Sequence, residues 1–196
     1  MAGKIFLSYR RVDAEWFATA LYLRLGQSFP AADLFMDVEG IEAGRDFVEV
    51  IEDQVRACDA MLVLIGPKWL TASDDAGRRR LDSPEDFVRI EVESALRYGK
   101  RVIPVLVPKT EMPRAEALPE PLKPLAQRQA VRLTHECFTD DTQSLIKVLA
   151  AALVEAEAAR HNAATEAIAA AGEQTARAVE VERRRQQAMP SSYRWW

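Results

Sequence analysis

The stretch Ala60-Met61-Leu62-Val63-Leu64-Ile65-Gly66 is apolar at every position before its glycine. A second stretch, residues 101–107, is apolar from Val102 onward. Strands covered on both faces of a parallel sheet have this continuous apolar character, whereas half-solvated strands alternate with polar residues. The two stretches therefore predict the middle of a parallel sheet. Pro104 counts against a fully central position for the second strand, or indicates a bulge.

Apolar and amphipathic segments alternate on either side of these stretches. This alternation, with short connections, predicts a flavodoxin-like, doubly wound α/β fold with five parallel strands. Right-handed crossovers place the ligand site of such a fold at the carboxyl ends of the strands. Residues 108–124 hold five prolines and predict a surface loop. The predicted strands are 4–8, 33–37, 60–66, 101–107 and 130–133, and the predicted helices are 14–27, 46–57 and 84–98.

A long helical pattern begins near Thr142. Its first part carries apolar residues at helical spacing and is expected to pack on the sheet. Beyond Glu155 the pattern is rich in Ala, Glu and Arg, and its apolar residues are too sparse for a heptad repeat. We therefore expect a globular domain over residues 1–155, followed by a helical arm and tail over 156–196.

Composition limits the classes of function. The net charge of −4 and the pI of about 5.4 give no global case for binding nucleic acid. The basic runs 78–80 and 183–185 adjoin acidic residues and are interpreted as solvated surface. No apolar run reaches the roughly 18 residues of a membrane span. The two cysteines, Cys58 and Cys137, lack metal or redox spacing, and without a signal peptide they indicate a cytoplasmic protein.

Polar and aromatic residues gather where the predicted strands end. The first strand ends in residues 8–11 (SYRR), the second in 37–45 (DVEGIEAGR) and the third in 66–69 (GPKW). No G-x-G-x-x-G, P-loop or G-x-S-x-G motif accompanies them, which argues against a Rossmann dinucleotide site, a P-loop site and a nucleophile-elbow hydrolase. The two histidines lie far from this edge, so no metal site is predicted.

Glu91 lies on the predicted helix 84–98, for which Ser83 is the expected N-cap. At about 100° per residue, Glu93 points to solvent, whereas Glu91 lies at the border of the apolar face, one turn after Phe87. A surface glutamate close to the boundary would have the same helical phase. A carboxylate held beside aromatic residues at the rim of a core is also a place where catalysis occurs.

Three segments, in this order, resemble the motifs of TIR domains. Residues 5–11 (IFLSYRR) are similar to the first box of that family, and residues 37–44 (DVEGIEAG) are similar to its BB loop. Residues 87–96 (FVRIEVESAL) resemble the helix that carries the catalytic glutamate of TIR NAD hydrolases, and by this resemblance Glu91 is that glutamate. Phe87 stands where the family often has Trp. Phenylalanine keeps a stacking face but lacks the indole N–H.

The resemblance implies an enzyme that cleaves the nicotinamide–ribosyl bond of NAD⁺, and linear and cyclic ADP-ribose products both stay open. Nicotinamide departs neutral, so the reaction needs a carboxylate beside the ribose rather than a strong acid. NAD⁺ is then the substrate, and no cofactor or metal is expected. The family also implies homotypic self-association, as an oligomer or filament, and a bacterial-style immune effector. The alternative is a non-catalytic TIR adaptor.

The arginine pair Arg10 and Arg11 is expected to meet the diphosphate of NAD⁺, because guanidinium groups match phosphate oxygens. A salt bridge to Asp13 or Glu42 explains the pair equally well.

Aromatic residues are expected to hold the nicotinamide, although Trp69 is explained equally well as a core anchor. Asp37 is interpreted as a loop cap and Gly44 as a source of loop flexibility. The expected substrate-binding residues are Ser8, Tyr9, Arg10, Arg11, Asp37, Glu42, Gly44, Trp69 and Phe87.

Overall fold

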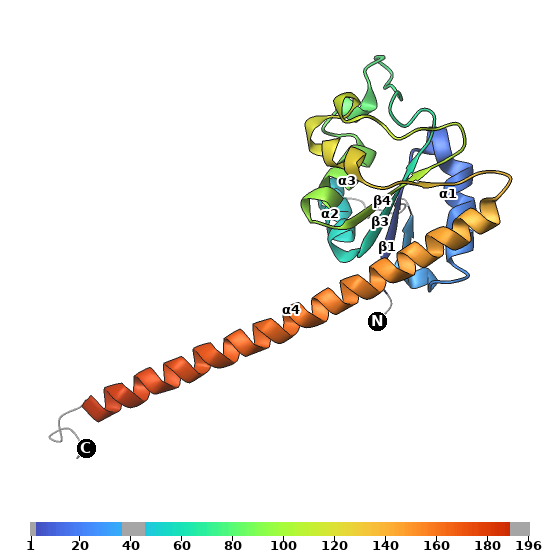
Figure 1. Cartoon of the computed structure of the whole chain (residues 1–196). Coiled ribbons are helices and arrows are strands. Elements are labelled where there is room, and N and C mark those ends of the chain that lie inside the picture. Colours follow the sequence, from blue (N-terminus) through green and yellow to red (C-terminus); the bar gives the residue numbers. More distant parts are fainter. Residues whose placement is uncertain (1–2, 37–45, 189–196) are drawn as a thin grey trace. The chain divides into compact units, whose positions relative to one another are not determined.

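The computed structural model describes residues 3–36 and 46–188. In this part of the chain, five parallel strands form one sheet in the order β2-β1-β3-β4-β5 (Figure 1). This order confirms the doubly wound parallel fold, and every predicted strand is present with slightly shorter bounds. The strands are β1 (Ile5–Ser8), β2 (Leu34–Met36), β3 (Ala60–Ile65), β4 (Arg101–Leu106) and β5 (Val131–Arg132).

Helices cover both faces of the sheet, with α1 on one side and α2 and α3 on the other (Figure 1). Short 3-10 segments join several of these elements. The α-helices are α1 (Arg11–Leu25), α2 (Phe47–Ala57), α3 (Phe87–Arg97) and α4 (Phe138–Ala188). The 3-10 segments are η1 (Ala31–Asp33), η2 (Arg80–Asp82), η3 (Ala115–Ala117) and η4 (Glu120–Gln127).

The core has two layers because successive strand residues point to opposite faces of a sheet. In β1, Ile5 and Leu7 enter the layer formed with α1 and the first part of α4, whereas Phe6 enters the layer formed with α2 and α3. All six residues of β3 are buried, since this strand lies between β1 and β4 and is covered on both faces. The continuous apolar run from which the sheet was predicted is thus the centre of the core.

Two expectations that rest on proline have different outcomes. Pro104 lies in β4, which is not an edge strand, but β5 pairs with β4 only at Val105 and Leu106. Pro104 therefore lies where β4 has a partner strand on one side only, and a residue without an N–H is tolerated there. Residues 108–124 are not simply a surface loop, because η3 and η4 form there and Leu122 is fully buried against the α2–α3 side of the core.

The chain divides into two compact units, Met1–Ala156 and Glu157–Trp196. In the second unit, every residue of α4 whose side chain is described is exposed. Ion pairs such as Glu173–Arg177 and Glu180–Arg184 follow the i,i+4 spacing that stabilises isolated helices. Among the described residues, no helix has the length and apolarity needed to cross a bilayer.

Candidate active site

A cavity of about 350 Å³ lies beside the carboxyl end of β1, the edge at which the fold was expected to bind a ligand. Its described lining comes from the residues that follow β1 and from α1, α2, η2 and α3. Side chains from three stretches of the sequence, residues 9–12, 47–51 and 80–91, thus meet in one place. The lining residues are Tyr9, Arg10, Arg11, Val12, Phe47, Ile51, Arg80, Phe87, Val88 and Glu91.

Glu91 lies in the second turn of α3, lines the cavity and is only 6% exposed. Glu93, two residues later, is partly exposed and pairs with Arg89 at 3.5 Å. The helical phase that separated the two glutamates in the sequence therefore corresponds to a real difference in burial. A buried carboxylate facing a cavity can hold hydroxyl groups or a developing positive charge.

The helix that carries Glu91 begins three residues later than predicted. Its N-cap is Asp86 rather than Ser83, and the Asp86 carboxylate accepts a hydrogen bond from the backbone N–H of Arg89 at 3.1 Å. Ser83 instead accepts a weaker bond from the N–H of Glu85 in the preceding turn. Asp86 is the stronger cap because the rest of the fold also fixes its carboxylate.

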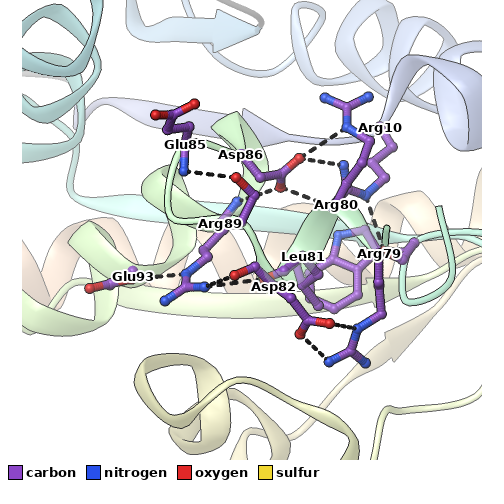
Figure 2. Close-up of polar contacts among 11 residues, drawn as sticks. Arg10, Arg79, Arg80, Leu81, Asp82, Glu85, Asp86, Arg89 and Glu93 are labelled. Carbon is purple, nitrogen blue, oxygen red and sulfur yellow. Dashed lines mark hydrogen bonds and ion pairs between the residues drawn. The ribbon is translucent and has the colours of Figure 1, made fainter. Parts of the chain in front are cut away.

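Arg10 holds the Asp86 carboxylate in place through two hydrogen bonds. Its two terminal amino groups donate to the two oxygens of Asp86, each at 2.9 Å, and its Nε donates to the carbonyl of Trp69 at 3.1 Å (Figure 2). Both side chains of the ion pair are only 1% exposed. Asp86, rather than Asp13, is therefore the ion-pair partner of Arg10, and Glu42 lies outside the described residues. The fork geometry holds the end of β1 against the start of α3.

Arg80 is a cavity residue that the sequence did not reveal. Its Nε lies 3.2 Å from Asp86 Oδ2, and its side chain is 40% exposed. The run 78–80 looked like solvated surface because consecutive basic residues usually are. The sequence did not single out Asp86 or Phe47 either. No local motif marks any of the three, since their relation depends on the packing of η2 and α2 against α3.

Aromatic side chains form one wall of the cavity. Phe87 is 51% exposed, and its ring centroid lies 4.1 Å from that of Phe47 at an interplanar angle of 48°. Tyr9, which follows β1, is partly buried and also lines the cavity. Trp69 and Ser8 are fully buried and are not among the described lining residues, and Trp69 belongs to the α2–α3 side of the core.

Asp13, in the first turn of α1, packs against the end of β3. Its Oδ1 accepts a hydrogen bond from the backbone N–H of Lys68 at 2.8 Å. Burial raises the pKa of this carboxyl above its ordinary value, partly offset by the Lys68 bond and the charge of Arg10. A Cβ at Gly66 would collide with the Asp13 carboxylate, so a larger residue at this position would displace the Asp13 side chain.

The predicted residues Asp37, Glu42 and Gly44 lie outside the described part of the chain. Within that part, no three His, Cys, Asp or Glu side chains are arranged to hold a metal ion.

Comparison with known proteins places the chain beside the following family and relatives. A family model described as TIR domain matches residues 5–149. The chain is 27% identical over 134 residues to NAD(+) hydrolase sarm1 of Drosophila melanogaster, covering 67% of this chain and 9% of that protein. It is 26% identical over 145 residues to NAD(+) hydrolase SARM1 of Danio rerio, covering 74% of this chain and 19% of that protein. The chain thus matches less than a fifth of the length of either relative.

Among solved structures, the chain resembles the TIR domains of the activated Roq1 resistosome, which directly recognises the pathogen effector XopQ. The TM-score is 0.54 at 13% identity, covering 76% of this chain and 99% of that chain. At this identity the likeness concerns the fold alone.

Proposed function

Since this chain belongs to the TIR domain family, and its relatives include proteins named as NAD⁺ hydrolases, we propose that it hydrolyses the nicotinamide–ribosyl bond of NAD⁺. The observation that carries the proposal is the buried carboxylate of Glu91 on the wall of a cavity that also presents aromatic and guanidinium groups. These are the groups that a ribose, a nicotinamide ring and a diphosphate require.

The reaction breaks the bond between ribose C1′ and the nicotinamide nitrogen. The electron pair of that bond goes to the ring nitrogen, so nicotinamide leaves neutral and the ribose becomes oxocarbenium-like. Glu91 binds the ribose hydroxyls and stabilises the positive charge as it develops. Water then adds at C1′ and loses a proton, which gives ADP-ribose. Attack by a nitrogen of the adenine in place of water would give the cyclic product.

In this proposal Phe87 and Tyr9, which both line the cavity, hold the nicotinamide. Phe87 is half exposed and lines the cavity, so its ring face is available to a ligand. Trp69 has no such face, because its side chain is completely buried.

Incubation of concentrated protein with NAD⁺, followed by chromatography for nicotinamide, tests the proposal. Wild type should release nicotinamide, and Glu91→Gln, which keeps the shape but removes the charge, should not. Glu93→Gln is the matched control on the same helix and should retain activity. Equal turnover by wild type and Glu91→Gln would refute the assignment.

Self-association is the second part of the proposal. Val12 and Phe87 line the cavity and are 66% and 51% exposed, so the cavity mouth carries apolar surface that water contacts. A neighbouring copy docked at the mouth would cover this surface and exclude water, which strengthens the electrostatic effect of Glu91. Trp16 and Leu23 continue the exposed apolar face along α1.

The alternative function, a non-catalytic adaptor, shares the self-association and lacks the turnover. A dilution series monitored by light scattering distinguishes the two. An assembly-activated hydrolase releases less nicotinamide per protomer as scattering falls to the monomer value. An adaptor assembles at high concentration and releases none at any concentration.

A further inference from the structure

The described lining of the cavity has an excess of positive charge, although the chain as a whole is acidic. Three guanidinium groups, from Arg10, Arg11 and Arg80, line it together with the single carboxylate of Glu91, as far as the described residues show. Even when the buried Asp86 behind the wall is included, three positive groups face two negative ones. The net charge of the whole chain is −4, so this excess is local. Such a cavity favours an anionic ligand.

Arg10 and Arg80 are not equally available to a ligand. Arg10 is 2% exposed and uses its Nε and both terminal amino groups on Asp86 and the Trp69 carbonyl. Turning Arg10 toward a ligand would leave the Asp86 carboxylate buried without its main counter-charge, which is costly. Arg10 therefore contributes structure rather than ligand binding.

Arg80 has the opposite arrangement. Its contact with Asp86 is made through Nε, at 3.2 Å (Figure 2). Its side chain is 40% exposed and lines the cavity. Among the described residues, its two terminal amino groups have no hydrogen-bond partner, and this pair of donors matches two oxygens of one phosphate group. Asp86 thus orients the guanidinium without using the donors that a phosphate needs.

The segment that carries Arg80 is itself well fixed. The backbone N–H of Arg80 donates to the carbonyl of Ala72 at 2.8 Å. The Arg89 side chain, on α3, donates to the carbonyl of Asp82 at 2.8 Å, and Arg79 donates to the carbonyl of Ala117 at 2.8 Å. These bonds attach η2 to α3 and to η3, so Arg80 is held at a constant position relative to Glu91.

We propose that Arg80 is a substrate-binding residue that contacts the diphosphate of a dinucleotide, with Asp86 as its positioning residue. The inference deepens the proposed function and rests on it for the identity of the dinucleotide. Whatever the dinucleotide is, the cavity binds a nucleoside diphosphate through Arg80 rather than Arg10.

Calorimetric titration with ADP tests the inference independently of turnover. Removing the guanidinium in Arg80→Gln should weaken ADP binding about tenfold or more, as expected for the loss of charge-assisted hydrogen bonds. Adenosine, which lacks phosphates, should bind wild type and Arg80→Gln equally. Arg78→Gln is the matched control, because Arg78 pairs with Asp74 on exposed surface and does not line the cavity. Arg78→Gln should bind ADP as wild type does.

Equal ADP binding by wild type and Arg80→Gln, or no binding of ADP by wild type at millimolar concentration, would overturn the inference. If Arg80→Gln does not fold, Arg80→Lys replaces it. Lysine keeps the charge but loses the paired donors, so its ADP affinity should lie clearly below wild type, and affinity equal to wild type would also overturn the inference.

Turnover separates this inference from the proposed function. In an active enzyme, Arg80→Gln should raise KM for NAD⁺ by at least as much as it weakens ADP, with a smaller effect on kcat. ADP binding that depends on Arg80 in a protein that never releases nicotinamide would refute the proposed function and leave the diphosphate contact standing. Nicotinamide release with an unchanged KM in Arg80→Gln would refute the diphosphate contact and leave the proposed function standing.

Discussion

Replacing Phe87 by alanine distinguishes a ligand-binding wall from a core residue. About half of the Phe87 side chain is buried, and its main aromatic neighbour is Phe47 at 4.1 Å. Full burial of a phenylalanine is worth about 1.5–3 kcal/mol, so half burial is worth about 1 kcal/mol. Loss of the aromatic pair adds about 0.5–1.5 kcal/mol. Phe87→Ala should therefore lower the free energy of unfolding by about 2 kcal/mol, against about 3–5 kcal/mol for a fully buried phenylalanine.

In a chain of this size, each kcal/mol corresponds to about 2–4 °C in melting temperature, so differential scanning calorimetry resolves the two cases. At a temperature well below unfolding, loss of the stacking face should reduce nicotinamide release about tenfold, the upper end of what a ring contact is worth. Phe87→Trp, which restores a ring, should keep or raise the rate. Leu23→Ala is the control, because it removes a comparably exposed apolar side chain that does not line the cavity.

Two results together would refute a ligand-binding role for Phe87. The first is a loss of about 4 kcal/mol or more in the free energy of unfolding of Phe87→Ala. The second is nicotinamide release at the wild-type rate by the folded variant. Phe87 would then be a core residue. Overpacking by Phe87→Trp would accompany that result.

Three further predictions concern charge and burial. Asp86→Asn should lower the free energy of unfolding by about 3–5 kcal/mol in urea titration, because Arg10 stays buried without its counter-charge; a loss below 1 kcal/mol would contradict the buried ion pair. The Arg97 guanidinium and the Tyr98 hydroxyl hold the pKa of Glu52 below its ordinary 4.5, so their stabilisation is complete above pH 4.5 and disappears as the pH falls through the lower folded value. Melting curves of Glu52→Gln should therefore vary less with pH in this acid range than those of wild type. Burial raises the pKa of the Cys58 thiol to about 11, so a thiol reagent at pH 8 should modify the exposed Cys137 in the native protein and Cys58 only after unfolding; equal rates would show that Cys58 is accessible.

The sheet was predictable because its evidence is local. Continuous apolar runs mark β3 and β4, and alternation with helical patterns gives the parallel topology. The burial of Leu122 is an exception to this local evidence. The buried role of Leu122 in a proline-rich segment depends on what the segment packs against, and a search for loops by proline content cannot detect it.

The site was predictable in part. The burial of Glu91 followed from helical phase, which is fixed by position in the chain. The different roles of Arg10 and Arg80 did not follow, because both contact Asp86 and only the packing of the fold buries Arg10 while it leaves Arg80 partly exposed. Trp69 illustrates the same limit, since an aromatic residue after a strand is compatible with a wall or with the core, and it lies in the core.

The pairing of Arg10 with Asp86 has a consequence for the order of folding. The two residues are 76 positions apart. Arg10, which follows β1, therefore leaves the ribosome long before the Asp86 carboxylate that neutralises it. At about 5–20 residues per second, this delay is about 4–15 s. During that time the end of β1 cannot be buried at low cost, and β3, its neighbour in the sheet, emerges within the same interval. Closure of the central strands should therefore coincide with the docking of α3, which brings Glu91 into the cavity in the same late step.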